Sequence, residues 1–476
     1  SFNYSFDAIG HSISVETSNF KEIFHPYHLT YTFILLLFYK IINIFSYFPA
    51  ISAGQILSLI FAVYSIYLFS LIMRILIKDI FFIICSVFYF TFSYWFWYYS
   101  MDAELHIPNI FFMLLSINLY IKLYREPSVK YVIYSAVINS FLIIFHQTNL
   151  IIFSITLLFN LEYFSDKKKV LVIWVISFLM ITIIPYIIIP HYFLGISSTS
   201  DLIEWLTRYQ SKGYWSNITQ NYLIDSMKGF SFALTGGGKI KLITNSVLAL
   251  LVLVYYFKKI FLKKIDRIEL YIFCIFIFYS GIVIYWHPAN PENWWAVMPF
   301  SILLFKAAES LKNTPVLFRG FDFTQKNISS LRILLLSFFS IFSIFLFKLF
   351  LNKIIKLFFI IWLLYSFNAV FNGYIVKYHK KESNQCFNII HNLNKIYNQG
   401  DLIISLGEGD LANLNVYLKY FTKYNFTTIA IELDLYSGSL EKTIESIACK
   451  INQTHGKIIL INDLYDVNGI SQLSKM

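Results

Sequence analysis

Acidic residues in short loops between apolar segments are the side chains of this sequence best suited to chemistry. Asp102 and Glu104 form a DAE motif directly after the aromatic run YWFWYY, and Asp7 and Glu292 stand in two other such loops. Carboxylates can act as general acids and bases, and partial desolvation raises their basicity. An alternative stays open for the DAE motif: a solvated loop, or the first turn of a helix, where acidic side chains are favourable.

Three histidines, His11, His25 and His28, accompany Asp7 in the N-terminal segment. Imidazole and carboxylate are ordinary metal ligands. The spacings contain no helical i, i+4 ligand pair apart from Asp7 and His11, so we assign no metal ligands. A divalent metal stays open as a cofactor, and the histidines can equally be polar caps at the start of a helix.

The elements that must position these side chains are predicted to be membrane helices. Of the 476 residues, 57% are hydrophobic and only 14% are charged, and the mean hydropathy is +0.62. A soluble core could not bury that much apolar surface, so we predict a polytopic α-helical membrane protein. The net charge of +11 comes from basic residues in short loops, which is typical of the positive-inside rule, and we expect no nucleic-acid partner.

Apolar runs define a predicted transmembrane helical domain over residues 52–375, with a long external loop at 190–241. The runs fall at 52–73, 80–98, 107–121, 131–145, 148–164, 170–189, 242–257, 268–286, 295–308, 332–347 and 355–374. Basic loops alternate with loops that lack Lys and Arg, so we expect the basic loops in the cytoplasm and the acidic ones outside. Past residue 332 the alternation fails, because strict counting places Lys348, Lys353 and Lys356 outside. The side of the C-terminal segment therefore stays open.

The stretch FHPYHLTYTFILLLFYK (24–40) has the hydropathy of a first membrane span. If it crossed the membrane, Asp7 would face the cytoplasm while Asp102 and Glu104 faced outside. We therefore predict a tilted helix on the outer membrane surface. Residues 1–51 are expected to form an external loop with juxtamembrane helices, and an upstream first span is expected to be missing.

The C-terminal segment, residues 384–476, has a different pattern. GDLIIS, TTIAIELD and KIILIND have the pattern of short buried strands, and SLEKTIESIACKINQ has that of a helix between the last two. Alternating strands and helices predict a small α/β domain with a parallel sheet. The GEGD motif lacks the full spacing of a dinucleotide-binding loop and gives little support for nucleotide binding.

Several of these motifs resemble those of membrane glycosyltransferases of the GT-C superfamily, which includes protein O-mannosyltransferases and lipid-A aminoarabinose transferases. FDAIGH, FHPYHLTYTFILLLFYK, DAE, YSAVINSFLIIFHQTNLIIF and HPANPENWWAVMPF stand in the order of that superfamily's motifs, over about residues 1–310. The chain departs from the pattern where HPYH replaces HPPL and where Asp7 lacks the acid often found beside it. A small C-terminal domain, often external, is also common among these enzymes.

The resemblance implies transfer of a sugar from a polyprenyl-phosphate donor to a hydroxyl of a lipid, glycan or protein acceptor. The site would face outside, in a bacterial plasma membrane. Asp7 would be the catalytic base, and Asp102 or Glu104 would orient the acceptor or position Asp7. The expected substrate-binding residues are His25 and His28 at phosphate or sugar hydroxyls, Arg208 and Lys212 at phosphate, Trp294 against a sugar ring, and Glu292.

Two other classes of function stay open. A polysaccharide polymerase or ligase is also polytopic, but such enzymes usually place arginines in their external loops, where this chain has mainly acids and aromatics. A lipid or solute transporter would be expected to carry repeated halves or ionisable groups at mid-membrane depth. The sequence shows no repeat, and His146 is its one span-associated ionisable group away from loops.

Overall fold

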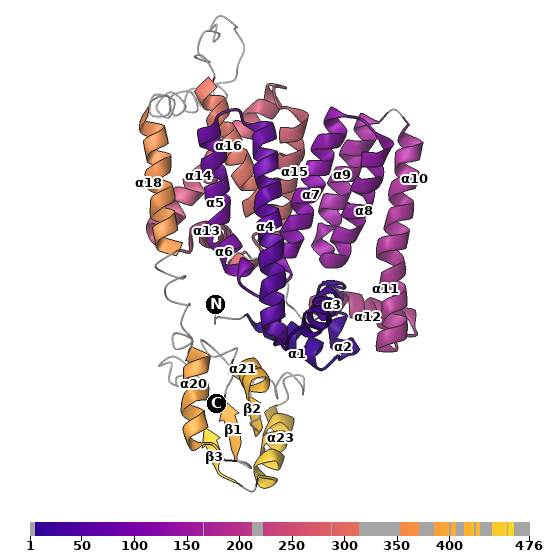
Figure 1. Cartoon of the computed structure of the whole chain (residues 1–476), viewed down its shortest axis with the longest axis vertical. Helices are drawn as coiled ribbons and strands as arrows, with labels where there is room; N and C mark the ends of the chain where they lie inside the picture. The colour runs from indigo at the N-terminus through magenta and orange to yellow at the C-terminus, as the bar shows by residue number, and fades with distance from the viewer. Residues whose placement is uncertain are drawn as a thin grey trace, which may run out of the picture.

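The protein is a helical bundle with a small α/β domain at one end (Figure 1). The computed structural model describes residues 5–164, 166–211, 222–286, 288–313, 353–370, 385–398, 401–405, 414–422, 425–428, 440–454 and 456–460. This polytopic helical architecture agrees with the predicted fold class.

Helices long and apolar enough to cross a membrane form the bundle. In the described part of the chain they are α4 (Ala50–Leu76), α7 (His106–Arg125), the continuous stretch Lys167–Leu194, α14 (Lys239–Phe261) and α15 (Arg267–Trp286). The stretch Lys167–Leu194 comprises α10 (Lys167–Phe178), η2 (Leu179–Ile183), α11 (Ile184–Ile189) and η3 (Pro190–Leu194). A bent pair, α5 (Ile80–Thr91) and α6 (Tyr94–Ser100), turns by 57°. The shorter helices are α8 (Val129–Phe145), α9 (Leu150–Tyr163), α16 (Val297–Asn313) and α18 (Lys353–Val370).

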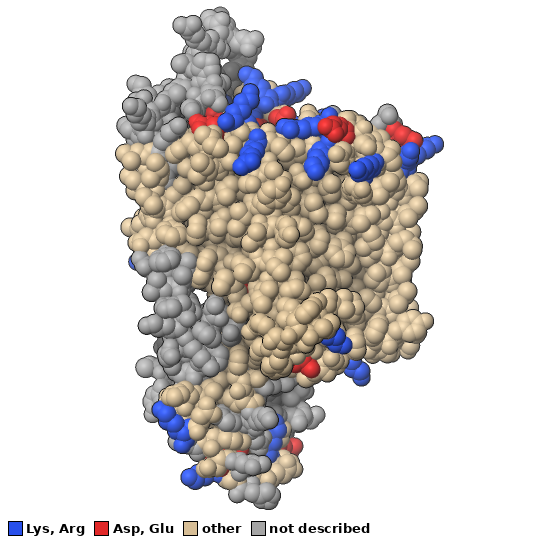
Figure 2. Space-filling model, viewed as in Figure 1, with Lys and Arg blue, Asp and Glu red and all other residues tan. Residues whose placement is uncertain are grey.

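Charged side chains gather at one end of the bundle, above a broad uncharged band (Figure 2). We call this the basic end, because helix termini there carry Arg74, Arg125, Lys167, Lys258 and Arg267. The opposite end, which faces the α/β domain, we call the site end. The uncharged band is what a hydrocarbon core requires, since charges there are costly.

The predicted surface helix forms α3 (Tyr31–Asn43) and lies at the site end beside α1 (Phe6–Glu16) and α2 (Phe20–Ile23) (Figure 1). With 13 residues it is about 20 Å long, too short to span a bilayer. Its N-terminal turn is buried, whereas Leu37 and Ile41 are exposed. α3 therefore has the form of a helix lying along a membrane surface.

The segment 190–241, predicted as a long loop, is largely helical where it is described. It contains η3, α12 (Thr199–Ser211), α13 (Tyr222–Thr235) and the start of α14. α13 packs against α6, most of which falls within the predicted span 80–98. Amphipathic segments such as α12 gain their helical stability from packing at an interface, which loop length alone does not reveal.

The direction of α18 shows at which end of the bundle its first residue lies. Tyr89 in α5 contacts Trp362, and Phe92, just after α5, contacts Phe367, so α18 runs roughly parallel to α5, from the basic end to the site end (Figure 1). Lys353 therefore begins α18 at the basic end, which agrees with one miscounted crossing rather than with strict alternation. The predicted span 332–347 lies outside the described residues, as does Lys348.

The α/β domain is built around a three-stranded parallel sheet of order β2-β1-β3. Its elements are α20 (Gln385–Ile396), β1 (Leu402–Ser405), α21 (Leu414–Phe421), β2 (Asn425–Thr428), α23 (Leu440–Asn452) and β3 (Ile458–Leu460). Parallel neighbours need crossover connections, and α21 and α23 stand where these are required. The predicted α/β class is thus correct, whereas the GEGD motif lies outside the described residues.

The α/β domain packs directly on the bundle. One apolar cluster joins its residues to α1, to the start of α4 and to Ala103, the middle residue of the DAE motif. At its edge the Tyr420 hydroxyl donates to Glu16 Oε1 at 2.7 Å, and the Ala50 N–H donates to the same oxygen at 2.8 Å. The domain therefore covers the loop that carries Asp102 and Glu104.

Candidate active site

The DAE loop holds the beginning of α1. Ser5 is the N-cap of that helix, and its Oγ accepts a hydrogen bond from the Ala8 N–H at 3.0 Å. The Ser5 N–H donates to Asp102 Oδ2 at 3.1 Å, and the Ser5 hydroxyl donates to Glu104 Oε1. Both carboxylates are 1% exposed. The two buried acids therefore fix the position of Asp7, two residues beyond the cap.

Helix α4 supports this loop from the bundle side. A Cβ at Gly54 would lie 2.5 Å from the Ala103 Cβ and 3.1 Å from its Cα, so only glycine permits this approach. Gln55 Nε2 donates to the carbonyl of Met101 at 2.8 Å. The backbone around Asp102 and Glu104 is thus packed between α4 on one side and the α/β domain on the other.

His106, which the sequence analysis did not select, connects two of the acids. Its Nε2 lies 2.7 Å from Glu104 Oε2 and 3.0 Å from Glu292 Oε1. The indole N–H of Trp295 donates to Nδ1 of His106 at 3.0 Å. Because an indole N–H can only donate, Nδ1 is unprotonated and the ring proton resides on Nε2, directed at the carboxylates. We call Asp7, Asp102, Glu104, His106 and Glu292 the acid cluster.

Part of the acid cluster has the donor types of a metal site. One atom each from Glu104, His106 and Glu292 lie within 4.8 Å of one another, and one imidazole with two carboxylates suits a divalent cation. A metal at His106 Nε2 would require the ring proton to move to Nδ1, and the bond from Trp295 would then be lost. In this structure the three side chains form a hydrogen-bonded unit.

The surroundings of these carboxyl groups raise their pKa values toward the range that suits a general base near neutral pH. Asp7 keeps solvent contact, but the protein atoms around its carboxyl desolvate it, and with the charge of Glu292 they raise its pKa to about 6. Burial raises the pKa of Asp102 to about 6 against the hydrogen bonds from Ser5. Burial also raises the pKa of Glu104, while His106 opposes the shift. Asp7 is the most accessible of the three, and among the described residues it has no hydrogen-bond partner.

His25 and His28 lie between α2 and α3 and form a stacked pair with ring centroids 4.5 Å apart. His11 of α1 meets His28 edge-on at 4.9 Å. The structure therefore groups the two predicted histidines with a third one, beside the acid cluster rather than bonded to it.

The other predicted binding residues have different surroundings. Trp294 is buried against Phe230, and its indole N–H donates to the carbonyl of Pro288, so it is Trp295 that contacts the acid cluster. Arg208 belongs to α12, but its side chain lies outside the described part of the structure, as does Lys212.

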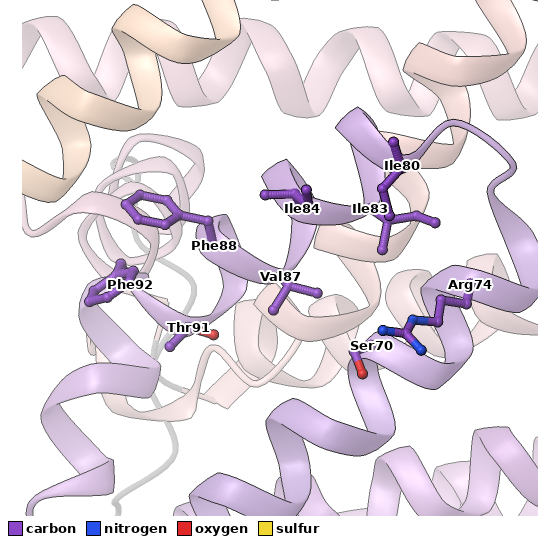
Figure 3. A pocket seen from close by; sticks show the side chains of 9 residues that line it. All are labelled: Ser70, Arg74, Ile80, Ile83, Ile84, Val87, Phe88, Thr91 and Phe92. Carbon is purple, nitrogen blue, oxygen red and sulfur yellow. The ribbon is translucent and has the colours of Figure 1, made fainter.

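A groove of about 370 Å³ lies elsewhere, on α4 and α5 (Figure 3). It is lined by Ser70, Arg74, Ile80, Ile83, Ile84, Val87, Phe88, Thr91 and Phe92. Arg74 and Ile80 stand at the basic end, and the lining contains no acid, so this groove is separate from the acid cluster.

Comparison with known proteins identifies the fold. No family model and no curated protein sequence matches the chain. The structure is similar to the crystal structure of ArnT from Cupriavidus metallidurans bound to undecaprenyl phosphate, with a TM-score of 0.55 and 8% sequence identity. The similarity covers 97% of this chain and 86% of that chain. The chain has the GT-C fold. The fold expected from the motifs is thereby confirmed over nearly the whole sequence.

The sequence contained a signal for the residues that were missed. His106 stands two positions after Glu104 in DAELH, and Trp295 is the second tryptophan of the WW pair. A Glu-x-His pattern at the start of a helix is short and common, however, and only the fold brings Glu292 to it from 186 positions away.

Proposed function

We propose that this protein is a glycosyltransferase that moves a sugar from a polyprenyl-phosphate donor to an acceptor hydroxyl. The observation that carries the proposal is the acid cluster, in which an accessible Asp7 is held on the buried DAE loop at the site end of a GT-C fold. ArnT, the similar solved structure, was crystallised with undecaprenyl phosphate, which supports a lipid phosphate as part of the substrate.

In the proposed reaction Asp7 accepts the proton of the acceptor hydroxyl as its oxygen attacks the anomeric carbon of the sugar. The new glycosidic C–O bond forms while the bond from that carbon to the phosphate oxygen breaks. The electron pair leaves with the polyprenyl phosphate, so no oxidant or reductant is needed. A positioned general base contributes ~10²–10⁴-fold to such a step.

The remaining cluster residues serve Asp7 and the substrates. Asp102 and Glu104 position α1 through Ser5, and the His106 Nε2–H orients Glu104 and Glu292. Glu292, the least buried of these partners, can accept a hydrogen bond from a substrate hydroxyl. A divalent cation bound by Glu104, His106 and Glu292 would replace the Nε2 proton and supply positive charge beside the leaving phosphate instead.

We further propose that the site end faces outside the cytoplasm of a bacterial plasma membrane. The basic end carries the clustered lysines and arginines, and the positive-inside rule assigns such an end to the cytoplasm. Asp7, the DAE loop and the α/β domain all lie at the opposite end. Arg208 and Lys212 remain proposed phosphate contacts.

Substitution of the base tests the proposal. Membranes containing the protein are incubated with a panel of radiolabelled undecaprenyl-phosphate sugars, and transfer to an endogenous acceptor is measured. We expect Asp7→Asn to lower the transfer rate by ~10²–10⁴-fold, because the amide cannot take the proton. Asp201→Asn, at an exposed acid of α12, is the matched control and should retain the wild-type rate. Equal rates for Asp7→Asn and wild type would remove Asp7 from the mechanism, and no transfer by wild type with any donor would overturn the proposed function.

A further inference from the structure

His11, His25 and His28 form a compact group beside the acid cluster, which we call the histidine cluster. His28 is central: its ring centroid lies 4.5 Å from that of His25 and 4.9 Å from that of His11. His11 is anchored by its Nδ1, which lies 2.9 Å from the hydroxyl of Thr32 in α3. The cluster thus ties together α1, the turn before α3 and α3 itself.

Two ring nitrogens of this cluster are buried without a hydrogen-bond partner among the described residues. They are Nε2 of His11 and Nδ1 of His28. A buried polar atom without a partner costs about 1–3 kcal/mol, and such atoms are rare in native proteins. When the Thr32 hydroxyl donates to His11 Nδ1, the ring proton resides on Nε2. The Nε2–H group can then donate to an acceptor supplied by a ligand.

Tyr31 connects the histidine cluster to the acids. Its ring lies edge-on to His11 at 5.1 Å, and its buried hydroxyl lies beside that of Ser58 in α4. Burial raises the pKa of the Tyr31 hydroxyl far above its usual range, and the nearby carboxylates of Glu104 and Asp102 raise it further. The unpartnered groups therefore border the place where the proposed reaction occurs.

On its other side the histidine cluster continues into an aromatic edge. Phe24, directly before His25, contacts Phe20, Phe33 of α3 and Phe193 of η3, with ring centroids between 5.1 and 6.2 Å apart. Phe20 and Phe193 are 37% and 43% exposed. A ligand whose polar head met the imidazoles would have an apolar surface for its tail at these rings.

We propose that His11 and His28 bind the phosphate of the lipid donor, and that its polyprenyl chain leaves along the aromatic edge of Phe20, Phe24 and Phe193. This inference rests on the proposed function and names the residues that hold its leaving group. Imidazole N–H groups donate to phosphate oxygens, and a phosphate in turn favours the cationic form of the ring, which strengthens the bond. A cation held there stabilises the phosphate charge that develops as the bond to the sugar breaks.

The electrostatic surroundings agree with this assignment. Burial lowers the pKa of His28 to about 4, and burial with the neighbouring His28 lowers that of His11. The cluster is therefore neutral without an anion, and an incoming phosphate supplies the compensating charge. The titratable groups that act on these two rings are the imidazoles of His28 and His106, while a backbone hydrogen bond partly opposes the fall in the pKa of His28. An ammonium group would therefore find no negative charge among them.

A binding experiment with two ligands tests the proposal. Purified protein in lipid nanodiscs is titrated with undecaprenyl phosphate, which carries no sugar, and with an undecaprenyl-phosphate sugar that the transfer assay accepts. We expect His11→Ala and His28→Ala each to weaken both ligands by about tenfold, the value of one lost charge-assisted bond. His191→Ala removes an exposed histidine of η3 and should bind both ligands like wild type.

A conservative variant guards against misfolding, and the outcomes separate the two proposals. His28→Gln keeps the size and a neutral donor, so it should fold as wild type and lose less affinity than His28→Ala. Loss of affinity for the sugar-bearing ligand alone would assign the cluster to the sugar and overturn the phosphate assignment. Wild-type affinity in all three cluster variants would also overturn it while leaving the proposed function intact. Failure of the wild type to bind either ligand would contradict the proposed function itself.

Discussion

At the scale of single residues, the acids of the cluster divide the work because their surroundings differ. Asp102 and Glu104 are buried and already accept hydrogen bonds from Ser5, so they are committed to structure. Asp7 is exposed and has no such partner among the described residues. A carboxyl whose oxygens accept hydrogen bonds thus serves as an anchor, whereas Asp7, which has none in the described residues, suits the proposed role of base.

The pH dependence of transfer follows from the state of Asp7. Its pKa is raised to about 6, and a general base must be ionised, so kcat/KM should rise with pH through about 6 and then level off. We expect this limb in measurements of transfer across the range from about one unit below to one unit above that value.

Asp102 also has a pKa raised to about 6, so a control must separate the two acids. The Asp102→Asn variant, although slower, should retain the rising limb, whereas the residual activity of Asp7→Asn should lack it. A limb that disappears with Asp102→Asn and persists in Asp7→Asn would exchange the roles of the two acids.

At the scale of elements, the approach of α4 to the DAE loop decides where the acids stand. Gly54 is the contact point, and its missing side chain lets Ala103 lie against the helix backbone. The α/β domain holds the same loop from the other side through the cluster that includes Ala103. The acid positions therefore depend on two interfaces that meet at one small residue.

A single methyl group at this interface should be harmful. Gly54→Ala places a Cβ 2.5 Å from that of Ala103, and such overpacking typically costs about 1–3 kcal/mol. We expect a lower melting temperature in detergent and a reduced transfer rate, because the loop must shift and α1 shifts with it.

Gly281→Ala in α15 is the matched control, since a Cβ there meets no atom within 4 Å. It should match wild type or melt slightly higher, because alanine is favoured over glycine in a helix. Equal melting temperatures and rates for the two variants would show that the contact of Gly54 with Ala103 does not matter.

At the scale of the whole molecule, the bundle separates the basic end from the end that carries the acid cluster. The α/β domain sits on the latter, where Tyr420 shares the carboxylate of Glu16 with the start of α4. One bond network thus joins α1, α4 and the C-terminal domain, so the domain belongs to the same compartment as Asp7.

Cysteine labelling tests this orientation with a native residue. Cys449 is exposed on α23, whereas Cys85 is buried in the bundle. In a Cys386→Ser background, we expect a membrane-impermeant maleimide to label the protein in intact cells, and the label to disappear when Cys449→Ser is added. Labelling of Cys449 only after the cells are permeabilised would place the site end in the cytoplasm and contradict the proposed orientation.

Local patterns in the sequence were sufficient to predict much of this fold. Apolar runs predicted α4, α7, α14 and α15, because a span of about 20 apolar residues must form a helix in lipid, where every backbone group needs an internal partner. The alternation of strands and helices predicted the parallel sheet for a similarly local reason. The acids of the site were also visible, as carboxylates that stand between apolar runs.

Only the tertiary structure decided which of these residues meet. Glu292 joins His106, and Tyr420 joins Glu16, across separations of 186 and 404 positions. Strict alternation of loop charges would misplace the start of α18, and loop length concealed α12 and α13, because both depend on how helices pack. Sequence determines what each segment prefers when considered alone, whereas burial and the hydrogen bonds that must accompany it are properties of the assembled chain.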